Sequence, residues 1–507
     1  MSKTIKVVLF ILSLSLVSLS CRLTSPTPAS WIGTPTAESR AATNAAILLT
    51  QEAAAANGLD LIPSPSPTAT ISTSTPTPEV AADGPWLVYP APDGSGVHAY
   101  DIDARKIIAI SLPTPITFTD LARGFSPDSN QIILRAGSPL NFDELALYQI
   151  ELPSTDPVQI SPLLSLELQR EIVNQVGSRA FETLQAVTLE DGITWSPSGR
   201  YLAFTAGLDN DSSDLYIFDT FNNDIQRLNG LYTQNASPFW APASNWLISQ
   251  ELGSYEEERG WRAENVTGLE VPGFDNLKSL YVPDPDSRKE VFVGWTNPQS
   301  FITYSETAEG FKMLQQVNVD KFKKTIILDG FFNQAAFDPE TKALAVSINH
   351  EFASLQEMTA GIYLLKPESP FLTLAQAGDW DRLYWDSGGQ FVTSGPQGVF
   401  IFDIQGDNIL LPGEENALLS PDGNWLLAWN DSGGSEDGLR LYQSDNDRPL
   451  QTISQDPIKS VIWASDSKTF FVQSEGVLYH LAFPGLSLEK IEDGFSKEVP
   501  MIWTWVE

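Results

Sequence analysis

Apolar and polar residues alternate in a recurring phrase from Pro85 to the end of the chain. A short apolar run ends in an aromatic or large aliphatic residue. A turn of Ser, Pro, Asp, Gly or Asn follows, and a second apolar run begins, as in residues 193–204 and 418–428. Proline presets one backbone angle of such a turn, Asp or Ser caps it, and Gly accepts a positive φ. Each phrase therefore predicts a β-hairpin.

The phrase recurs at a spacing that is typical of one architecture. Six further copies surround Phe125, Trp240, Trp295, Phe337, Trp385 and Trp463. Apart from two stretched units, the spacing is close to the roughly 40–45 residues of a propeller blade. A third strand follows most copies, often after Gly, as at 96–100, 398–402 and 476–480, and a weaker fourth follows it, as at 225–228. Four strands per unit predict a blade, and we expect the aromatic residue to pack between neighbouring sheets.

This repeat resembles the WD40-like repeat of TolB-type propellers over about residues 85–507. The resemblance implies an all-β fold with a single closed β-propeller of four-stranded blades. It implies little about function, because this repeat serves many unrelated roles.

The two ends of the repeat region are complementary. Residues 501–506 match the first strand of a blade with nothing after it, and residues 86–89 match a second strand without its first. Joining them completes one blade and closes the ring, which removes open sheet edges. With eight internal copies this predicts nine blades. Eight is the alternative, because the unit at 240–282 is irregular.

One insertion interrupts the period at residues 163–187. Its Leu, Ile and Val residues lie among Glu, Gln and Arg at helical spacing, with Gly177 as a break. The pattern predicts one or two amphipathic helices. They either decorate the ring or dock a partner.

The N-terminal region has a different composition. Residues 1–20 combine Lys3 and Lys6 with an apolar run too short for a stable membrane span, which is typical of an export signal. Cys21 follows, and here the chain resembles a bacterial lipoprotein, although Ser18 and Leu19 depart from that family's pattern. The resemblance implies lipidation of Cys21, anchoring to the membrane and an extracytoplasmic location. An ordinary cleaved signal or an uncleaved anchor is the alternative.

Residues 21–84 are rich in Pro, Thr, Ser and Ala. Such a composition buries too little apolar surface to fold alone and predicts a disordered tether. An Ala-rich stretch at 36–57 is expected to be partly helical, with Gly58 as its stop. We interpret the whole segment as a spacer between membrane and propeller.

Charge and cysteine content limit the classes of function. The chain carries 64 acidic and 30 basic residues, for a formal net charge of −34. Such a field repels phosphate backbones, so we expect no nucleic-acid partner, and it favours a soluble monomer. A single cysteine excludes a disulfide within the chain, and we expect neither a cofactor nor a metal site of the Cys/His kind.

Catalytic motifs are absent from the sequence, and we expect no catalytic residues. His98, His350 and His480 all lie in segments predicted as strands, and no nucleophile elbow or phosphate-binding loop occurs. Acidic turns at 209–214, 284–286 and 445–447 carry oxygen ligands that Ca²⁺ prefers, but such residues are also ordinary in turns. Residues 255–259 are predicted to form an exposed loop.

Three functions remain after these exclusions. The favoured one is a scaffold that binds a protein or small ligand outside the cytoplasm. The second is a propeller enzyme, or a subunit of one, that acts on an extracellular glycan or peptide. The third is a structural subunit of an envelope complex.

Overall fold

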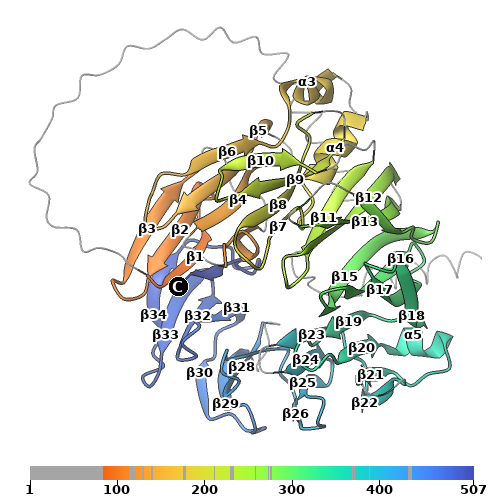
Figure 1. Ribbon diagram of the computed structural model, residues 1–507. Helices are drawn as coiled ribbons and strands as arrows, with labels where there is room; N and C mark the ends of the chain where they lie inside the picture. Colours follow the sequence, from red (N-terminus) through yellow and green to blue (C-terminus); the bar gives the residue numbers. More distant parts are fainter. Residues whose placement is uncertain are drawn as a thin grey trace, which may run out of the picture. The chain divides into compact units, whose positions relative to one another are not determined.

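The computed structural model describes residues 84–506, with short gaps at 113–119, 128–130, 139–140, 175–178, 210–211, 229–232, 257–258, 272, 274–276, 368, 370, 387–388 and 432–436. The predicted signal, Cys21, the tether and the Ala-rich stretch at 36–57 lie outside these residues. The described part is an all-β ring of nine blades (Figure 1). The predicted fold class and the count of nine are therefore confirmed.

Eight blades are antiparallel sheets of four strands in chain order. The first combines β35 (Thr504–Val506), β1 (Trp86–Pro90), β2 (Gly96–Asp101) and β3 (Lys106–Ser111). The third contains β7 (Ile193–Trp195), β8 (Tyr201–Ala206), β9 (Asp214–Asp219) and β10 (Asp224–Arg227), and the fourth β11 (Gln234–Trp240), β12 (Trp246–Glu256), β13 (Gly260–Glu270) and β14 (Lys278–Tyr281). The fifth contains β15 (Ser287–Asn297), β16 (Ser300–Thr307), β17 (Lys312–Asn318) and β18 (Lys323–Gly330), and the sixth β19 (Gln334–Phe337), β20 (Leu344–Ile348), β21 (Gly361–Leu365) and β22 (Thr373–Ala377).

The remaining blades complete the circle. The seventh contains β23 (Arg382–Asp386), β24 (Gln390–Gly395), β25 (Gly398–Phe402) and β26 (Asn408–Leu411), and the eighth β27 (Asn416–Leu419), β28 (Trp425–Asn430), β29 (Gly438–Gln443) and β30 (Gln451–Ser454). The ninth contains β31 (Ile458–Trp463), β32 (Thr469–Ser474), β33 (Val477–Ala482) and β34 (Glu489–Asp493). The second blade contains β4 (Gln131–Ser138), β5 (Asn141–Glu151) and β6 (Val158–Pro162), and its first strand is reduced to a bridge between Phe125 and Ile132.

The chain ends close the ring as predicted. Strand β35 pairs with β1 in antiparallel register, with Trp86 opposite Val506 and Val88 opposite Thr504. Figure 1 shows the C-terminal strands β31 to β34 beside β1, β2 and β3. The pairing of β35 with β1 in the composite first blade therefore covers the edge of β1 that would otherwise be open.

The recurring aromatic residue joins neighbouring blades. The indole nitrogen of Trp195 donates to the carbonyl of Gly124 at 2.7 Å, that of Trp240 to Thr194 at 3.2 Å and that of Trp463 to Leu418 at 3.3 Å. Each acceptor lies at or just before the end of the preceding blade's first strand. In these three blades the residue therefore packs between sheets and also satisfies its own polar group, whereas the indole nitrogens of the equivalent Trp295 and Trp385 are buried without a hydrogen-bond partner among the described residues.

The hairpin turns follow the predicted chemistry. The hydroxyl of Ser420 accepts a hydrogen bond from the Trp425 amide at 3.0 Å, and Gly423 has a φ of +71°. The amide of Asp422 donates to the hydroxyl of Ser467 in the next blade at 2.9 Å. Equivalent turns of adjacent blades are thus hydrogen-bonded to one another.

The meander gives the ring two distinct faces. Successive strands reverse direction, so the turns between first and second and between third and fourth strands lie on one face, which we call the bottom face. Connections between second and third strands, and between one blade and the next, lie on the other, the top face. In Figure 1 the first strands β7, β11, β15, β19 and β23 lie toward the centre of the ring and the fourth strands β3, β10, β18 and β22 at its periphery.

Candidate functional site

The regular helices of the described residues are all inserted on the top face. Helices α3 (Leu166–Asn174) and α4 (Arg179–Val187) lie between the second and third blades, and α5 (His350–Leu355) lies between β20 and β21. A 3-10 turn, η1 (Asp120–Ala122), also precedes the second blade there. One or two helices were predicted within 163–187, and two are present, whereas α5 was not predicted.

Helix α3 has one face buried in the propeller and one face open. Ser165 begins it, because its hydroxyl accepts a hydrogen bond from the Leu168 amide at 3.2 Å. Leu168 and Ile172 are buried in the core below, whereas Leu166 and Val173 are 69% and 56% exposed. The open face offers two aliphatic side chains about two helical turns apart.

Helix α4 packs against the long hairpin of the fourth blade. Strands β12 and β13 have eleven residues each and extend above the ring. Leu252 and Trp261 of this hairpin form a small core with Ala186 of α4, and the Tyr255 amide donates to Glu182 at 3.5 Å. We call α3, α4 and hairpin residues 252–256 and 259–261 the crest.

Below the crest, a chain of polar side chains crosses three blades. The hydroxyl of Ser237 donates to Asp191 at 2.7 Å and accepts from the amide group of Gln250 at 2.7 Å. The oxygen of Gln250 accepts from the backbone amide of Glu290 at 3.4 Å. The Tyr281 hydroxyl then donates to Oε2 of Glu290 at 2.7 Å. These contacts fix the first strands of blades three, four and five at their top ends.

Glu290 is the most perturbed carboxyl group in this chain of contacts. It is 2% exposed, and burial raises its pKa to about 7. Hydrogen bonds from Tyr281, Ser287 and Thr303 act in the opposite direction, because they favour the charged form. Glu251, on β12, is also buried and has its pKa raised by burial. Buried carboxyl groups of this kind hold blades together and lie away from solvent.

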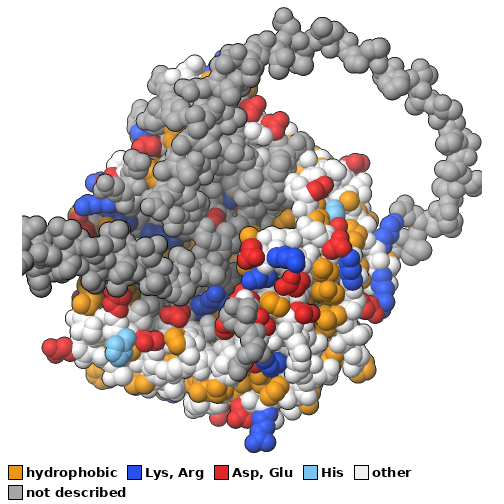
Figure 2. All heavy atoms as spheres, turned by 180° about the vertical axis from the view of Figure 1, so that it is seen from behind, with side chains coloured by type: hydrophobic (Ala, Val, Ile, Leu, Met, Phe, Trp, Pro, Cys, Tyr) orange, Lys and Arg blue, Asp and Glu red, His pale blue; other side chains and the backbone are white. Residues whose placement is uncertain are grey.

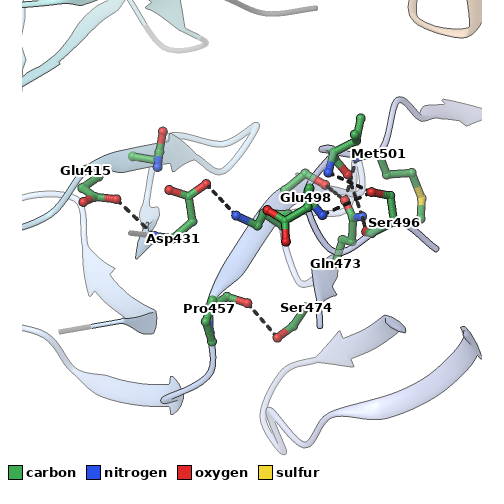
Figure 3. A network of polar contacts seen from close by, with 12 residues as sticks. Glu415, Asp431, Pro457, Gln473, Ser474, Ser496, Glu498 and Met501 are labelled. Atoms are coloured by element: carbon green, nitrogen blue, oxygen red, sulfur yellow. Dashed lines mark hydrogen bonds and ion pairs between the residues drawn. The ribbon is translucent and has the colours of Figure 1, made fainter. Parts of the chain in front are cut away.

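A second polar network lies at the top ends of blades eight and nine (Figure 3). Lys459 pairs with Asp431 at 3.6 Å, and the Asp431 amide donates to Glu415 at 3.1 Å. The amide group of Gln473 donates to the carbonyls of Ser496 and Val499, both at 3.0 Å, and its oxygen accepts from the Met501 amide at 2.6 Å. Gln473 therefore holds the segment that leads into β35.

The three histidines do not share a site. His98 lies in β2 and contacts Glu492 at 2.9 Å, to which the Tyr89 hydroxyl also donates at 2.9 Å. His480 lies in β33, stacked on Phe471, and burial lowers its pKa. The prediction of a strand at His350 is wrong, because Asn349 caps helix α5 through a hydrogen bond from the Phe352 amide at 2.9 Å.

The predicted acidic turns lie apart from one another. Residues 209–214 and 284–286 lie on the top face and 445–447 on the bottom face. Arg227 pairs with Asp214 at 2.6 Å, and the Tyr216 hydroxyl donates to Asp209 at 2.9 Å. Asn210 and Asp211 lie outside the described residues. No group of three or more His, Cys, Asp or Glu side chains suited to a metal ion occurs in the described part of the chain.

Of the residues 255–259 predicted as an exposed loop, Tyr255 and Glu256 lie in β12, and Arg259 is an exposed turn residue before β13. Glu256 pairs with Arg288 of the fifth blade at 3.1 Å, and Tyr255 packs on Trp261. Glu257 and Glu258 lie outside the described residues. The described residues of this segment therefore belong to the crest.

Sequence reasoning missed α5 and the two polar networks. The Asn349 cap was a local signal for α5, since Asn is a favoured N-cap residue. The network around Glu290 has no such signal, because its members come from three blades and alternate with apolar residues in ordinary strands. Within the described residues, no helix is long and apolar enough to cross a bilayer.

Comparisons with known proteins are informative for the fold alone. No family model matches the chain, and no curated protein does. A solved structure of the eukaryotic initiation factor is similar at a TM-score of 0.51 and 10% identity, over 83% of this chain and 98% of that one. Dipeptidyl peptidase 4 of Porphyromonas gingivalis is similar at a TM-score of 0.45 and 13% identity, over 78% of this chain and 65% of that one. TolB of Acinetobacter baumannii is similar at a TM-score of 0.28 and 12% identity, over 61% of this chain and 76% of that one.

Proposed function

We propose that the protein is a lipid-anchored, extracytoplasmic scaffold that binds a protein partner or ligand on the top face of its propeller. The observation that carries this proposal is the asymmetry of the ring. Helices α3, α4 and α5 and the extended β12–β13 hairpin are all inserted on the top face. Insertions that the ring does not need for closure are where propellers and other rigid scaffolds place binding groups.

The crest is the part of the top face with the strongest features of a binding surface. Leu166 and Val173 expose aliphatic side chains on a helix whose other face is firmly buried. An amphipathic helix presented in this way is a known mode of protein recognition. The acidic net charge of −34 favours a partner with a neutral or basic surface.

The partner proposal can be tested in the cells of origin. A photo-crosslinking residue at Leu166 or Val173 should yield a defined adduct, and the same residue at Leu450 on the bottom face should not. The variant with Leu166→Ser and Val173→Ser should lose this partner and keep its thermal midpoint. Equal adducts from both faces would refute a top-face site.

The anchor is tested separately at Cys21. A metabolically incorporated acyl probe should label the full chain, and the Cys21→Ala variant should remain unlabelled and leave the membrane fraction. Equal labelling of both chains would show that Cys21 is not the anchor.

Catalysis on a glycan or peptide is the second candidate. One observation favours it, namely the pKa of about 7 at Glu290, since a general acid or base works best near the ambient pH. Its burial opposes the idea. Turnover of glycan or peptide substrates that survives purification and disappears in Glu290→Gln would establish an enzyme.

A further inference from the structure

The bottom face carries apolar side chains at equivalent places in several blades. The connection between the third and fourth strands, which we call the outer turn, exposes a large apolar side chain in blades three, five, six, eight and nine. These side chains are Phe221, Phe322, Phe371, Leu450 and Leu488. Phe221 and Phe371 are 85% and 73% exposed, which is unusual for phenylalanine in water. Single exposed apolar residues are ordinary, but repetition at one position around a ring indicates a surface.

Basic side chains lie next to these apolar tips. Lys321 and Lys323 flank Phe322, and Arg448 lies two residues before Leu450. All three are exposed, and none of them pairs with a carboxylate in the part of the chain that the structure describes. In blade three, the Arg200 guanidinium lies 5.8 Å from the ring centre of Phe221, while also pairing with Asp219. Unpaired cations are notable in a chain with 64 acidic and 30 basic residues.

The described chain also begins on the bottom face. Strand β1 starts at Trp86 opposite Val506, the end of β35, and the Gly84 amide donates to Asp101 at the end of β2 at 3.3 Å. All three of these positions are bottom ends of their strands. The segment that leads back to Cys21 therefore joins the propeller on the face with the apolar tips, opposite the crest.

We infer that the outer turns of the bottom face rest against the bilayer in which the chain is anchored. The net charge of −34 opposes long-range attraction to anionic headgroups, so the contact rests on short-range interactions. Aromatic rings insert at the membrane–water interface, and neighbouring cations meet headgroup phosphates there. The inference rests on the proposed anchor at Cys21, which would hold the turns at a high effective concentration near the bilayer. Weak contacts at several turns then orient the ring with its crest toward the exterior.

Figure 2 draws one face of the molecule and shows apolar, acidic and basic side chains interspersed in the part coloured by type. On the top face, exposed apolar residues lie on inserted helices, as Leu166 and Leu355 do, or in two of the connections between blades, as Val282 and Val499 do. Apolar tips recur at the outer turns of five blades, and those of blades three, five and eight also have a neighbouring cation.

The test uses the acylated full chain in vesicles of neutral and anionic lipid. Cys21 is the single cysteine of the sequence, and acylation blocks it, so one introduced cysteine can carry an environment-sensitive fluorophore. Phe322→Cys and Leu450→Cys report on the bottom face. Leu355→Cys is the matched top-face control, because Leu355 is 61% exposed and Leu450 is 64% exposed.

A quencher attached to lipid headgroups should quench the probes at 322 and 450 several-fold more than the probe at 355. Reversing the charges with Lys321→Glu and Lys323→Glu should weaken quenching at 322 in anionic vesicles and leave it unchanged in neutral ones. Equal quenching at all three positions would overturn the inference. If the bottom-face probes become more protected as the protein density on the vesicle rises, and the lipid quencher has no effect on them, the bottom face contacts a second copy of the chain instead.

The two proposals fail in different ways. A mass spectrum without an acyl group on Cys21 overturns the anchor, and with it the inference as stated. An acylated chain whose bottom-face probes are not quenched overturns the bilayer contact alone.

Discussion

Single aromatic residues carry much of the contact between blades. Trp195 is buried between the second and third blades and donates its indole hydrogen to Gly124 across that interface. A bulky ring excludes water there, and its indole N–H finds a buried partner in the Gly124 carbonyl, which also accepts from the Ile133 amide at 2.7 Å. The recurrence of this residue is the part of the sequence from which the blades were predicted.

Replacing Trp195 therefore tests the blade contact. We expect Trp195→Ala to lower the free energy of unfolding by about 3–5 kcal/mol, because a large cavity remains. Trp195→Phe should lower it by about 1–2 kcal/mol, close to the value of one hydrogen bond plus a small volume loss. Urea unfolding followed by fluorescence measures both, and the exposed Phe221→Ala is the control, with an expected change within about 0.5 kcal/mol.

Glu290 should make stability depend on pH. Its pKa is raised from 4.5 when unfolded to about 7 in the fold. Below pH 4.5 both states are protonated, so the fold has its full stability. As pH rises toward 7, the unfolded state ionises first and stability falls, by about 3 kcal/mol if each pKa unit counts for about 1.4 kcal/mol.

The Glu290→Gln variant isolates this effect. An amide of the same shape keeps most contacts with Tyr281 and Ser287 but does not titrate. We expect the difference in unfolding midpoint between pH 5 and pH 8 to shrink in the variant. An unchanged difference would assign the pH dependence to other groups.

At the scale of elements, the strand pattern was predictable and the networks between elements were not. The composite first blade was predicted from the unmatched strands at Trp503 and Trp86. A four-stranded blade needs one first strand and one second strand, and each of these two segments supplies the one that the other lacks. Asn349 shows the opposite case, since a helix cap between two strands was overlooked in a strand-like run. Gln250 of the fourth blade and Glu290 of the fifth come together only when these two blades are assembled, so no local pattern places them in one network.

Removing the last strand should open the ring. A chain that ends at residue 500 lacks β35 and leaves the edge of β1 unpaired. We expect a loss of about 2–5 kcal/mol, similar to the loss of a large buried side chain, together with association through the open edge. Thermal unfolding and size-exclusion chromatography measure these effects. A chain that ends at Val506 is the matched control and should behave as the full chain does.

At the scale of the whole molecule, the net charge of −34 acts against compactness. Raising the salt concentration from about 0.01 M to about 0.15 M shortens the screening length from about 30 Å to about 8 Å. We expect the thermal midpoint of the full chain to rise over this range. A fall would mean that attractive pairs such as Arg200 and Asp219 outweigh the repulsion.

The seam of the first blade also constrains how the molecule is made. The hydrogen bond between Tyr89 and Glu492 spans 403 residues of sequence, and the pairing of β1 with β35 spans still more. Such distant contacts form slowly and late. Because β1 precedes every other strand of the ring along the chain and β35 follows them all, the circle stays open until β35 is free to pair, after all the other blades have been made.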